Sequence, residues 1–399
     1  MLKIFMVSFT GKGGHPVYVN EVIVALNKNC SADVKVEFLA PQDLEKKYFR
    51  NGYVVHADLP AYPVRGKKLN ALWRTEQIGH FIRSYLVCFL WLRKQKDSCG
   101  VHFQDSLWLL GMFFWVFRFL KVPLFFTVHN IKPHKYSGLM PHVIEEKFYK
   151  FVWRSCEGLF VHSQGLKSEA IQFLGNGHPS IYVVPHGLFL VNSSVMTPLL
   201  IRMNKKRLLF FGAIRENKGL HLLLEAMKSL DGFELTIAGK IADHVYWRET
   251  VTPLLDSLRL QDKKVTLIDV FIPDHEVAAL FDSHSAVILS YTQGFHSQSG
   301  VLHLAVALDT PVVATSVGGI GDLIEKYKVG TLARSCDAAQ VKDAILSLFK
   351  EEAGQLQANF NLAKEDLSWV KLAAGTCHAY KFSQSLKKKN CALADGCVS

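Results

Sequence analysis

This sequence lacks an apolar run long enough to cross a lipid bilayer. Its most hydrophobic segment, residues 107–126, is interrupted by Arg118 and Lys121, and its longest uncharged run has eleven residues. A membrane-spanning helix needs about 20 consecutive apolar residues. The amino terminus, MLKIFMVSFTGKGG, also lacks the apolar region and small-residue cleavage site of a secretory signal. We therefore expect a first β-strand and its loop there.

Paired cysteines and internal repeats are also missing. The eight cysteines are scattered without any CxxC pair, and most lie in apolar or helical contexts. This argues against a zinc framework and favours reduced thiols in a cytoplasmic protein. No repeat of 20–50 residues is evident, and low-complexity sequence is confined to the tail SLKKKNCALADGCVS.

Acidic residues are scarce in the first half of the chain. Residues 1–195 contain 23 Lys and Arg against 13 Asp and Glu, whereas residues 196–399 contain 23 against 22. Most of the net charge of +11 therefore belongs to the first half. A one-sided basic field favours an anionic partner, namely a membrane surface, a nucleic acid or a phosphorylated acceptor; a merely solvated face is the alternative. Because no RNA- or DNA-binding module is recognisable, we expect no nucleic acid partner.

What is present is a regular alternation of short apolar runs and longer helical patterns. A chain of 399 residues with 49% hydrophobic and 20% charged residues predicts two globular domains. The expected strands are KIFMVSF, VKVEFLA, GVHFQ, PLFFTVHN, GLFVHS, IYVVPHG, RLLFFGAI, FELTIAGK, KVTLIDVF, SAVILSY, TPVVATS and VGTLA. Continuous apolar strands alternating with helices predict an α/β protein with doubly wound parallel sheets.

The two halves meet in a segment without a clear period, LFLVNSSVMTPLLIRMNKK, which we interpret as a linker. We expect a first domain over residues 1–190, which faces the acceptor and the membrane, and a second, nucleotide-sugar-binding domain over residues 206–368. A helix over residues 369–385 would return to the first domain, and residues 386–399 would form a flexible tail. Ligands of such sheets bind where the carboxyl ends of the strands carry converging loops.

Several of these loops together match one family. In order they are TVHN (127–130), VVPHG (183–187), FFGAIRENKG (210–219), TIAGK (236–240) and SGVLHLAVALDTPVVATSVGG (299–319). In this order and spacing they resemble the retaining GT-B glycosyltransferases of family 4, over about residues 5 to 380. SWVKLAAGTCHAY also looks like the closing helix of that family.

The resemblance implies a GT-B fold, in which two tandem Rossmann-like domains enclose an interdomain cleft. It also implies an enzyme that moves a sugar from a nucleotide-diphosphate-sugar to an acceptor, here a lipid-linked or polysaccharide one. The donor would lie mainly on the second domain and the acceptor mainly on the first, with domain closure assembling the site.

The leaving diphosphate develops negative charge, and without a metal it needs a Lys or Arg and the N–H groups of a helix start. Lys218 stands where the family has its diphosphate lysine, which makes it a catalytic candidate; a surface lysine that caps a helix is the alternative. Gln298, Ser299, Gly300 and Val301 open a helix whose N–H groups would cradle phosphate oxygens, unless they form a plain cap.

Further candidates for donor binding follow strands in both halves. Gly13 and Gly14 follow the first strand, where glycine lets the backbone approach a ligand closely. Gly187 supplies the turn in VVPHG, and Gly239 follows the strand FELTIA. Arg215 lies three residues before the lysine and is expected to turn toward the diphosphate.

Two histidines end strands of the first half. The resemblance places His129, in FFTVHN, against the transferred sugar, where it is the second catalytic candidate; a structural histidine is the alternative. His186, in PHG, stands where the family often has Asn. The seventeen histidines form no convincing metal site, so we expect no metal and no cofactor besides the nucleotide-sugar.

The sequence also departs from the family pattern. The family commonly has an Arg where this chain has Ala213. It also commonly has two glutamates eight positions apart, of which the first falls on or near His296 and the second on Leu304. We expect an active enzyme in which uncharged polar groups replace these carboxylates. A catalytically impaired nucleotide-sugar sensor or scaffold is the alternative.

The aromatic stretch LWLLGMFFWVFRFL places Trp108, Met112, Trp115 and Phe119 at helical spacing. One interpretation is a helix buried between the sheet and its neighbours. The other is an interfacial helix, helped by SYLVCFLWLRKQK at residues 84–96, on an anionic leaflet. The second interpretation predicts a peripheral protein on the inner face of the membrane.

Overall fold

The computed structural model describes residues 1–11, 14–50, 52–61, 71–95, 100–105, 114–131, 142–188, 196–295, 299–317 and 319–395. The chain divides into two compact units. The first combines Met1–His186 with Trp369–Ser399, and the second is Gly187–Ser368. Each unit is built around its own parallel β-sheet.

The first unit contains a seven-stranded parallel sheet in the order β3-β2-β1-β4-β5-β6-β7. Its strands are β1 (Leu2–Val7), β2 (Val34–Pro41), β3 (Val55–Leu59), β4 (Gly100–Phe103), β5 (Leu124–Thr127), β6 (Gly158–Val161) and β7 (Ser180–Val183). The order reverses between β1 and β4, so the loops that leave these two strands diverge there. This topological switch point is where ligands of such sheets bind.

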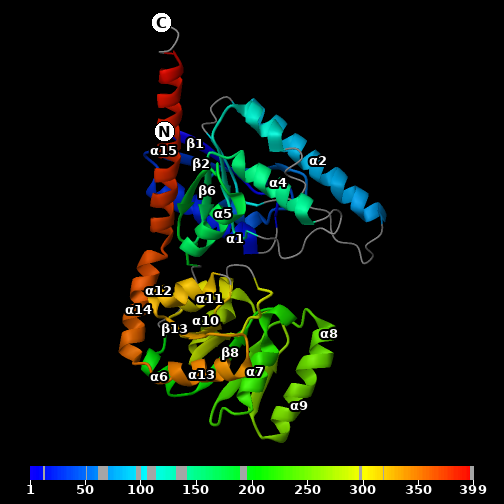
Figure 1. Ribbon diagram of the computed structural model, residues 1–399, viewed down its shortest axis with the longest axis vertical. Coiled ribbons are helices and arrows are strands. Elements are labelled where there is room, and N and C mark those ends of the chain that lie inside the picture. The colour runs from blue at the N-terminus through cyan, green and yellow to red at the C-terminus, as the bar shows by residue number, and fades with distance from the viewer. Residues whose placement is uncertain are drawn as a thin grey trace. The chain divides into compact units, whose positions relative to one another are not determined.

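Helices cover both faces of this sheet (Figure 1). They are α1 (Gly14–Asn29), α2 (Ala71–Lys94), α4 (His142–Arg154), α5 (Gln164–Leu174) and α15 (Trp369–Asp395), with the 3₁₀ turns η1 (Lys46–Arg50) and η2 (Phe114–Leu120). Side chains alternate along β1: Ile4 and Met6 pack with α1 and α15, whereas Phe5 and Val7 pack with α2, η2 and α4. This alternation follows from the two-residue period of a strand and makes β1 apolar on both sides.

The second unit contains a six-stranded parallel sheet in the order β10-β9-β8-β11-β12-β13, whose switch point lies between β8 and β11. Its strands are β8 (Arg207–Phe211), β9 (Glu234–Ala238), β10 (Lys264–Ile268), β11 (Ala286–Leu289), β12 (Val312–Thr315) and β13 (Gly330–Ala333). Its helical elements are α6 (Leu199–Met203), η3 (Glu216–Lys218), α7 (Leu220–Met227), α8 (His244–Tyr246), η4 (Trp247–Val251), α9 (Thr252–Leu260), α10 (Asp274–Asp282), α11 (Gly300–Ala307), α12 (Ile320–Tyr327), α13 (Ala338–Leu348) and α14 (Ala353–Asp366).

The predicted pair of doubly wound parallel sheets is confirmed. All twelve expected strands are present, and the structure adds the edge strand β3. The stretch expected as one helix over residues 107–120 is described only from Phe114, and that part is the 3₁₀ turn η2. Trp108 and Met112 lie outside the described residues. No helix within the described ranges is long and apolar enough to cross a membrane.

Candidate functional site

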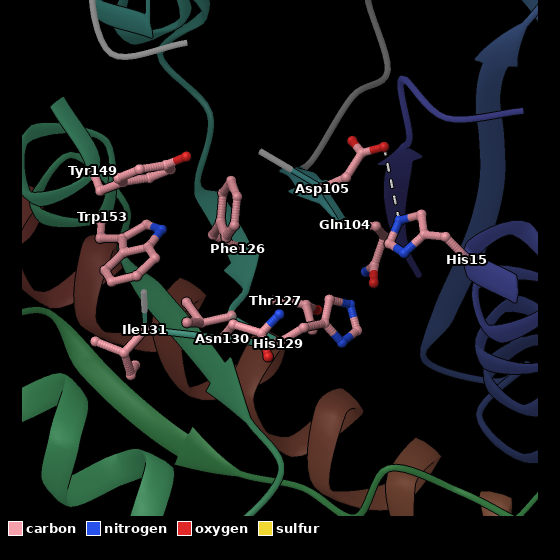
Figure 2. Close-up of a pocket in the computed structure, with 11 residues that line it drawn as sticks. His15, Gln104, Asp105, Phe126, Thr127, His129, Asn130, Ile131, Tyr149 and Trp153 are labelled. Atoms are coloured by element: carbon pink, nitrogen blue, oxygen red, sulfur yellow. Dashed lines mark ion pairs between the residues drawn. The ribbon is translucent and has the colours of Figure 1, made fainter. Parts of the chain in front are cut away.

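A cavity of about 280 Å³ lies at the carboxyl ends of β4 and β5 in the first unit (Figure 2). Its described lining residues combine aromatic rings with small polar groups, as in many small-molecule sites. They are His15, Gln104, Asp105, Phe126, Thr127, Val128, His129, Asn130, Ile131, Tyr149 and Trp153.

Asp105 connects the two loops at the switch point of the first sheet. It follows β4, and its carboxylate accepts hydrogen bonds from the backbone N–H of Phe9 at 3.0 Å and from the hydroxyl of Ser8 at 3.0 Å. Both donors follow β1. Hydrogen bonds to an ionised carboxylate are stronger than neutral ones, so they fix the position of Asp105 at the edge of the cavity.

His15 lies beside this carboxylate, at the start of α1. Its Nε2 is 3.8 Å from Oδ2 of Asp105. Burial lowers the pKa of His15, and the charge of Asp105 opposes that shift. The imidazole is therefore neutral near pH 7 and lies next to a group that stabilises its protonated form.

His129, a predicted catalytic residue, also lines this cavity, directly after β5 and Val128. Its ring meets the ring of His15 edge-on, with 5.4 Å between centroids. Burial lowers the pKa of His129 far below its usual value, and the neighbouring His162, His15 and His102 lower it further. A hydrogen bond to the backbone of Gln104 acts in the opposite direction. His129 is therefore neutral, and its catalytic role stays a prediction.

The strands β5, β6 and β7 are each followed by a histidine, and these three side chains surround Tyr18 of α1. The centroid of the Tyr18 ring lies 5.0 Å from that of His129, 5.6 Å from that of His162 and 4.8 Å from that of His186. The Tyr18 hydroxyl is also 3.4 Å from Nε2 of His162. His186, which the sequence placed only at a turn, thus belongs to a buried aromatic cluster beside the cavity.

Several buried polar atoms of the cavity have no hydrogen-bond partner among the described residues. They are Nε2 of His15, both amide atoms of Gln104, Nε2 of His129, Oδ1 of Asn130 and Nε1 of Trp153. Buried polar groups are nearly always paired in folded proteins, because an unpaired one costs about 1–3 kcal/mol. These donors and acceptors can pair with water or with a polar ligand, so the cavity suits a polar ligand.

In the second unit, Lys218 lies at the switch point between β8 and β11. Its ammonium nitrogen is 3.8 Å from the centroid of the Tyr291 ring and 4.4 Å from that of Phe295. Both rings follow β11. Burial and, to a lesser extent, the nearby charge of Arg215 together lower the pKa of Lys218 to about 8. Among the described residues, no carboxylate forms an ion pair with this lysine.

Gly219 allows the lysine loop to lie directly on the loop after β11. Its φ is +62°, and a Cβ there would lie 1.8 Å from the carbonyl oxygen of Ser290. Two hydrogen bonds join the same loops: the Ser290 hydroxyl donates to the Gly219 carbonyl at 2.9 Å, and the Thr292 N–H donates to the Asn217 carbonyl at 3.1 Å. Only glycine fits this position, and Lys218 is thereby held against Tyr291.

The start of α11 lies at the same place. Ser299, buried, caps this helix by accepting the N–H of Leu302, and its hydroxyl is 3.2 Å from the hydroxyl of Tyr291. Gly300 and Val301 form the first turn of α11, and Gly212 of the loop after β8 faces Val301. The structure therefore brings Lys218, Ser299, Gly300 and Val301 together around the switch point.

The other predicted residues are more scattered. Arg215, exposed, precedes η3 and is close enough to influence Lys218. Gly239 has φ +148°, and a Cβ there would lie 2.0 Å from the carbonyl oxygen of Gly212, so it serves the packing of two loops. Gly14 begins α1, and Gly187 has φ +81° at the start of the second unit. Gly13 and Gln298 lie outside the described residues.

Sequence reasoning missed the partners of these residues. It did not find Asp105 and His15 in the first unit, or Tyr291 and Phe295 in the second. Each follows a correctly predicted strand or the first glycine loop, so the rule that loops at the carboxyl ends of strands carry function would have found them. In the part of the chain that the structure describes, no group of three His, Cys, Asp or Glu side chains has the arrangement of a metal site.

The known proteins to which this chain is similar include glycosyltransferases. Residues 205–351 match the family described as glycosyl transferases group 1. The chain is 24% identical to the glycogen synthase of Mycobacterium tuberculosis over 281 residues, which are 66% of this chain and 64% of that protein. It is 22% identical over 400 residues to the alpha-maltose-1-phosphate synthase of Mycolicibacterium smegmatis, covering 92% and 95% of the two chains. The match thus spans just under two thirds of the length of the glycogen synthase.

Solved structures show the fold. Sucrose-phosphate synthase from Thermosynechococcus elongatus superposes with a TM-score of 0.70 at 17% identity, covering 97% of this chain and all of that one. Anabaena Alr3699/HepE in complex with UDP gives a TM-score of 0.70 at 14% identity, again over 97% of this chain and all of the other. Residues 205–351 are therefore similar to the group 1 glycosyltransferases, and the two parallel sheets have the architecture of the GT-B fold.

Proposed function

We propose that this chain transfers a sugar, with retention of its anomeric configuration, from a nucleotide-diphosphate-sugar to a lipid-linked or polysaccharide acceptor. The second unit holds the donor and the first unit holds the acceptor. The observation that carries the proposal is Lys218, a desolvated cation without a carboxylate partner among the described residues, next to the start of α11.

The environment of Lys218 suits a diphosphate leaving group. As the bond from the sugar to the diphosphate breaks, negative charge develops on the leaving oxygen. A cation held in a dry site stabilises that charge more strongly than a hydrated one, and the first N–H groups of a helix add to the effect. Arg215 supplies a second positive charge close by. These groups need no metal to neutralise the leaving group, so we propose transfer without a cofactor.

The cavity of the first unit suits a sugar ring. Its unpaired donors and acceptors match hydroxyl groups, and Phe126, Tyr149 and Trp153 offer rings to the C–H faces of a pyranose. Among its described lining residues the only carboxylate is Asp105, whose oxygens already accept two hydrogen bonds. We therefore propose no covalent carboxylate intermediate in the reaction.

The comparisons support the class of donor and acceptor. The relatives include the putative colanic acid biosynthesis glycosyltransferase WcaL of Escherichia coli, which is 28% identical over 156 residues, or 38% of each chain. Anabaena Alr3699/HepE has been solved with UDP and with UDP-glucose. These names favour a hexose donor carried on a nucleotide and a glycan product.

A second candidate function is that of a nucleotide-sugar sensor with impaired catalysis. It is favoured by Leu304, which packs against the core of the second unit where the family carries a carboxylate. The two functions differ in turnover. Purified chain would be tested against a panel of nucleotide-sugars, first for thermal stabilisation and then for release of nucleoside diphosphate with and without glycan acceptors. Acceptor-dependent release supports transfer, whereas tight binding without release across the panel supports the sensor.

We also propose that the first unit lies on an anionic membrane surface. The 3₁₀ turn η2 exposes two aromatic side chains in edge-to-face contact, Trp115 and Phe119, whose centroids are 5.8 Å apart. The exposed Arg118 and Lys121 are close to them in the sequence. The helix α2, which packs against η2, exposes further apolar and basic side chains. These are Leu86, Leu90, Arg93 and Lys94. Aromatic and basic side chains together are typical of proteins that bind the lipid headgroup region.

Co-sedimentation with vesicles tests this part of the proposal. We expect binding to vesicles that contain phosphatidylglycerol, weaker binding to pure phosphatidylcholine, and a loss of binding in the double variant Trp115→Ala, Phe119→Ala. Leu260→Ala, which changes an exposed leucine of the second unit, is the control. Equal binding of the double variant and the wild type would contradict the membrane surface without affecting the proposed transfer.

A further inference from the structure

The first unit contains two cysteines that the proposed function does not use, Cys30 and Cys377. Cys30 directly follows α1, and Cys377 belongs to α15. Both thiols are free, and both side chains are buried in the same apolar cluster. We propose that this pair is a redox modification site, at which a peroxide joins the two sulfurs in a disulfide that fastens α15 to α1. This inference goes beyond the proposed function and does not depend on it.

Two flanking contacts place Cys377 against Cys30. Residues 373, 377 and 381 follow one another at intervals of four, so their side chains share one face of α15. The Cys30 thiol donates a hydrogen bond to the Ala373 carbonyl at 3.5 Å, one turn before Cys377. One turn after Cys377, the Lys381 ammonium nitrogen is 2.5 Å from a carboxylate oxygen of Asp33. The face of α15 that carries Cys377 therefore lies along the end of α1.

The two thiols are hydrogen-bonded to each other and lie close to solvent. Burial, and after it the charge and hydrogen bond of Cys377, raise the pKa of the Cys30 thiol to about 11. The charge of Asp33 adds to this shift of the pKa, and the charge of Lys381 opposes it. Cys30 is therefore protonated near pH 7 and reacts slowly there. The side chains of Asp33 and Lys381 are 45% and 48% exposed, so a small oxidant can reach the pair beside them.

The other described cysteines are placed differently. Cys88 and Cys156 pack with the cluster on the opposite face of the first sheet, and Cys336 belongs to the second unit. The Cys156 thiol donates to the Val152 carbonyl of the preceding helix α4 at 3.4 Å. Among the cysteines whose side chains the structure describes, the thiol–thiol hydrogen bond is thus found at Cys30 and Cys377.

The oxidation consumes one peroxide for each disulfide. One thiol loses its proton and its sulfur attacks a peroxide oxygen, so an S–O bond forms, the O–O bond breaks and hydroxide leaves. The second thiol loses its proton and its sulfur attacks the resulting sulfenic acid, so the S–S bond forms, the S–O bond breaks and a second hydroxide leaves. The two hydroxides take up the two protons and become water. The two sulfurs together lose two electrons, and the peroxide gains them.

The disulfide would act on a helix that completes the core of the first unit. α15 contributes Leu372 and Tyr380 to the cluster that also contains residues of α1 and β1. The two cysteines are separated by most of the chain, and a bond across such a distance strongly restricts the unfolded state. We therefore expect the oxidised protein to melt about 5–10 °C higher than the reduced protein.

The experiment uses full-length protein that has been reduced and then freed of reductant. Hydrogen peroxide is added to the folded chain, the remaining thiols are blocked with iodoacetamide, and the unreduced protein is digested for mass spectrometry. We expect a linked pair of peptides that joins Cys30 to Cys377. Between pH 7 and pH 8.5 the link should form up to about tenfold faster per pH unit, because the thiolate is the reacting form. Dithiothreitol should remove both the link and the rise in melting temperature.

Two variants complete the test. Cys377→Ala should show neither the link nor the rise, whereas Cys156→Ala, which removes a buried thiol on the other face of the same sheet, should show both. The proposal is overturned if the folded wild type links Cys30 to a different cysteine, forms no link, or melts at the same temperature with and without it. These outcomes are measured on the wild type, so they decide the question even if Cys377→Ala does not fold. None of them affects the proposed transfer of sugar.

Discussion

Lys218 and Tyr291 form a close cation–π contact, with the ammonium nitrogen 3.8 Å from the ring centroid. The two residues follow β8 and β11, the strands that flank the switch point of the second sheet. A desolvated contact of this kind contributes about 2 kcal/mol. It keeps the charge in place and out of water without neutralising it. Under the proposed function, the diphosphate would therefore bind to a cation that is already desolvated.

Replacement of this lysine tests its role most directly. In Lys218→Ala we expect kcat to fall about 10²–10³-fold, because the leaving diphosphate loses its main positive partner. The fold should be unchanged, since the residue forms no ion pair with a described carboxylate. Lys228→Ala, which removes a lysine paired with Glu225 in the same unit, is the control. The measurement is the initial rate of transfer with a nucleotide-sugar. A Lys218→Ala variant as fast as the wild type would contradict a role of Lys218 in catalysis.

Donor affinity should depend on pH above neutrality. Burial lowers the pKa of Lys218 to about 8, so in the folded chain the ammonium is charged below this pH and neutral above it. We expect the association constant for uridine diphosphate to be flat just below pH 8 and to fall by up to about tenfold per pH unit above it. Calorimetric titrations measure this, and Lys218→Gln should show no such fall.

The same lowered pKa has an effect on stability with a defined sign. From about pH 8 to the ordinary lysine value of 10.5, the unfolded chain binds more protons than the folded chain. The free energy of unfolding should therefore gain a rising contribution from Lys218 in this window. A difference between wild type and Lys218→Gln that stays constant across the window would contradict the lowered pKa.

Gly219 should tolerate no side chain. In Gly219→Ala the new Cβ must adopt φ near +62° and would meet the Ser290 carbonyl at 1.8 Å. We expect the free energy of unfolding to fall by about 2–5 kcal/mol, from the left-handed backbone and the displaced loop together. Gly232→Ala is the matched control, because its φ is +76° and no atom lies within 4 Å. Urea unfolding measures the stability of both variants. Equal losses in Gly219→Ala and Gly232→Ala would show that the loop around Gly219 can move away from Ser290 at no cost.

Acid should weaken the first unit through His102. This histidine is buried, with Nδ1 2.5 Å from the Tyr380 hydroxyl and Nε2 2.8 Å from the Thr127 hydroxyl, and burial lowers its pKa to about 3. Because the folded pKa lies below the unfolded value of 6.5, stability is lost as the pH falls through the interval between them. At about pH 5 the cost is about 2 kcal/mol.

Urea unfolding near neutral pH and near pH 5 checks this dependence. The loss on acidification should be smaller in His102→Gln, which is itself less stable at neutral pH. His178→Gln should behave as the wild type, because His178 is exposed. An unchanged acid dependence in His102→Gln would assign the effect to other groups.

The fold could be predicted because most strands are apolar on both sides. Continuous apolar runs such as LFFTV and AVIL predict strands that are covered by helices on both faces. The strand that was missed, β3 (Val55–Leu59), lies at the edge of the first sheet and buries only Leu59 fully. Its sequence VHADL has no continuous apolar run, so hydrophobic pattern alone could not find it.

Site residues could be predicted only where a single sequence motif contains them. Lys218 and Ser299 stand within motifs and were found. The pairs Asp105 with His15 and Lys218 with Tyr291 depend on which strands are neighbours, and strand order is decided by packing over the whole sheet. Likewise, η2 buries Phe114 and Phe117 and exposes Trp115 and Phe119, whereas helical periodicity grouped Trp115 and Phe119 on one face without deciding which face is buried.

The first unit is discontinuous, because α15 supplies part of its core. Leu372, Ala373 and Tyr380 pack with residues of α1 and β1, and Tyr380 reaches the buried His102. On the ribosome, the first 186 residues emerge long before this helix exists. The second unit, continuous from Gly187 to Ser368, can complete its core earlier. The first unit is thus expected to complete its fold last. A nascent chain stalled before residue 369 would expose an apolar strip to which chaperones bind.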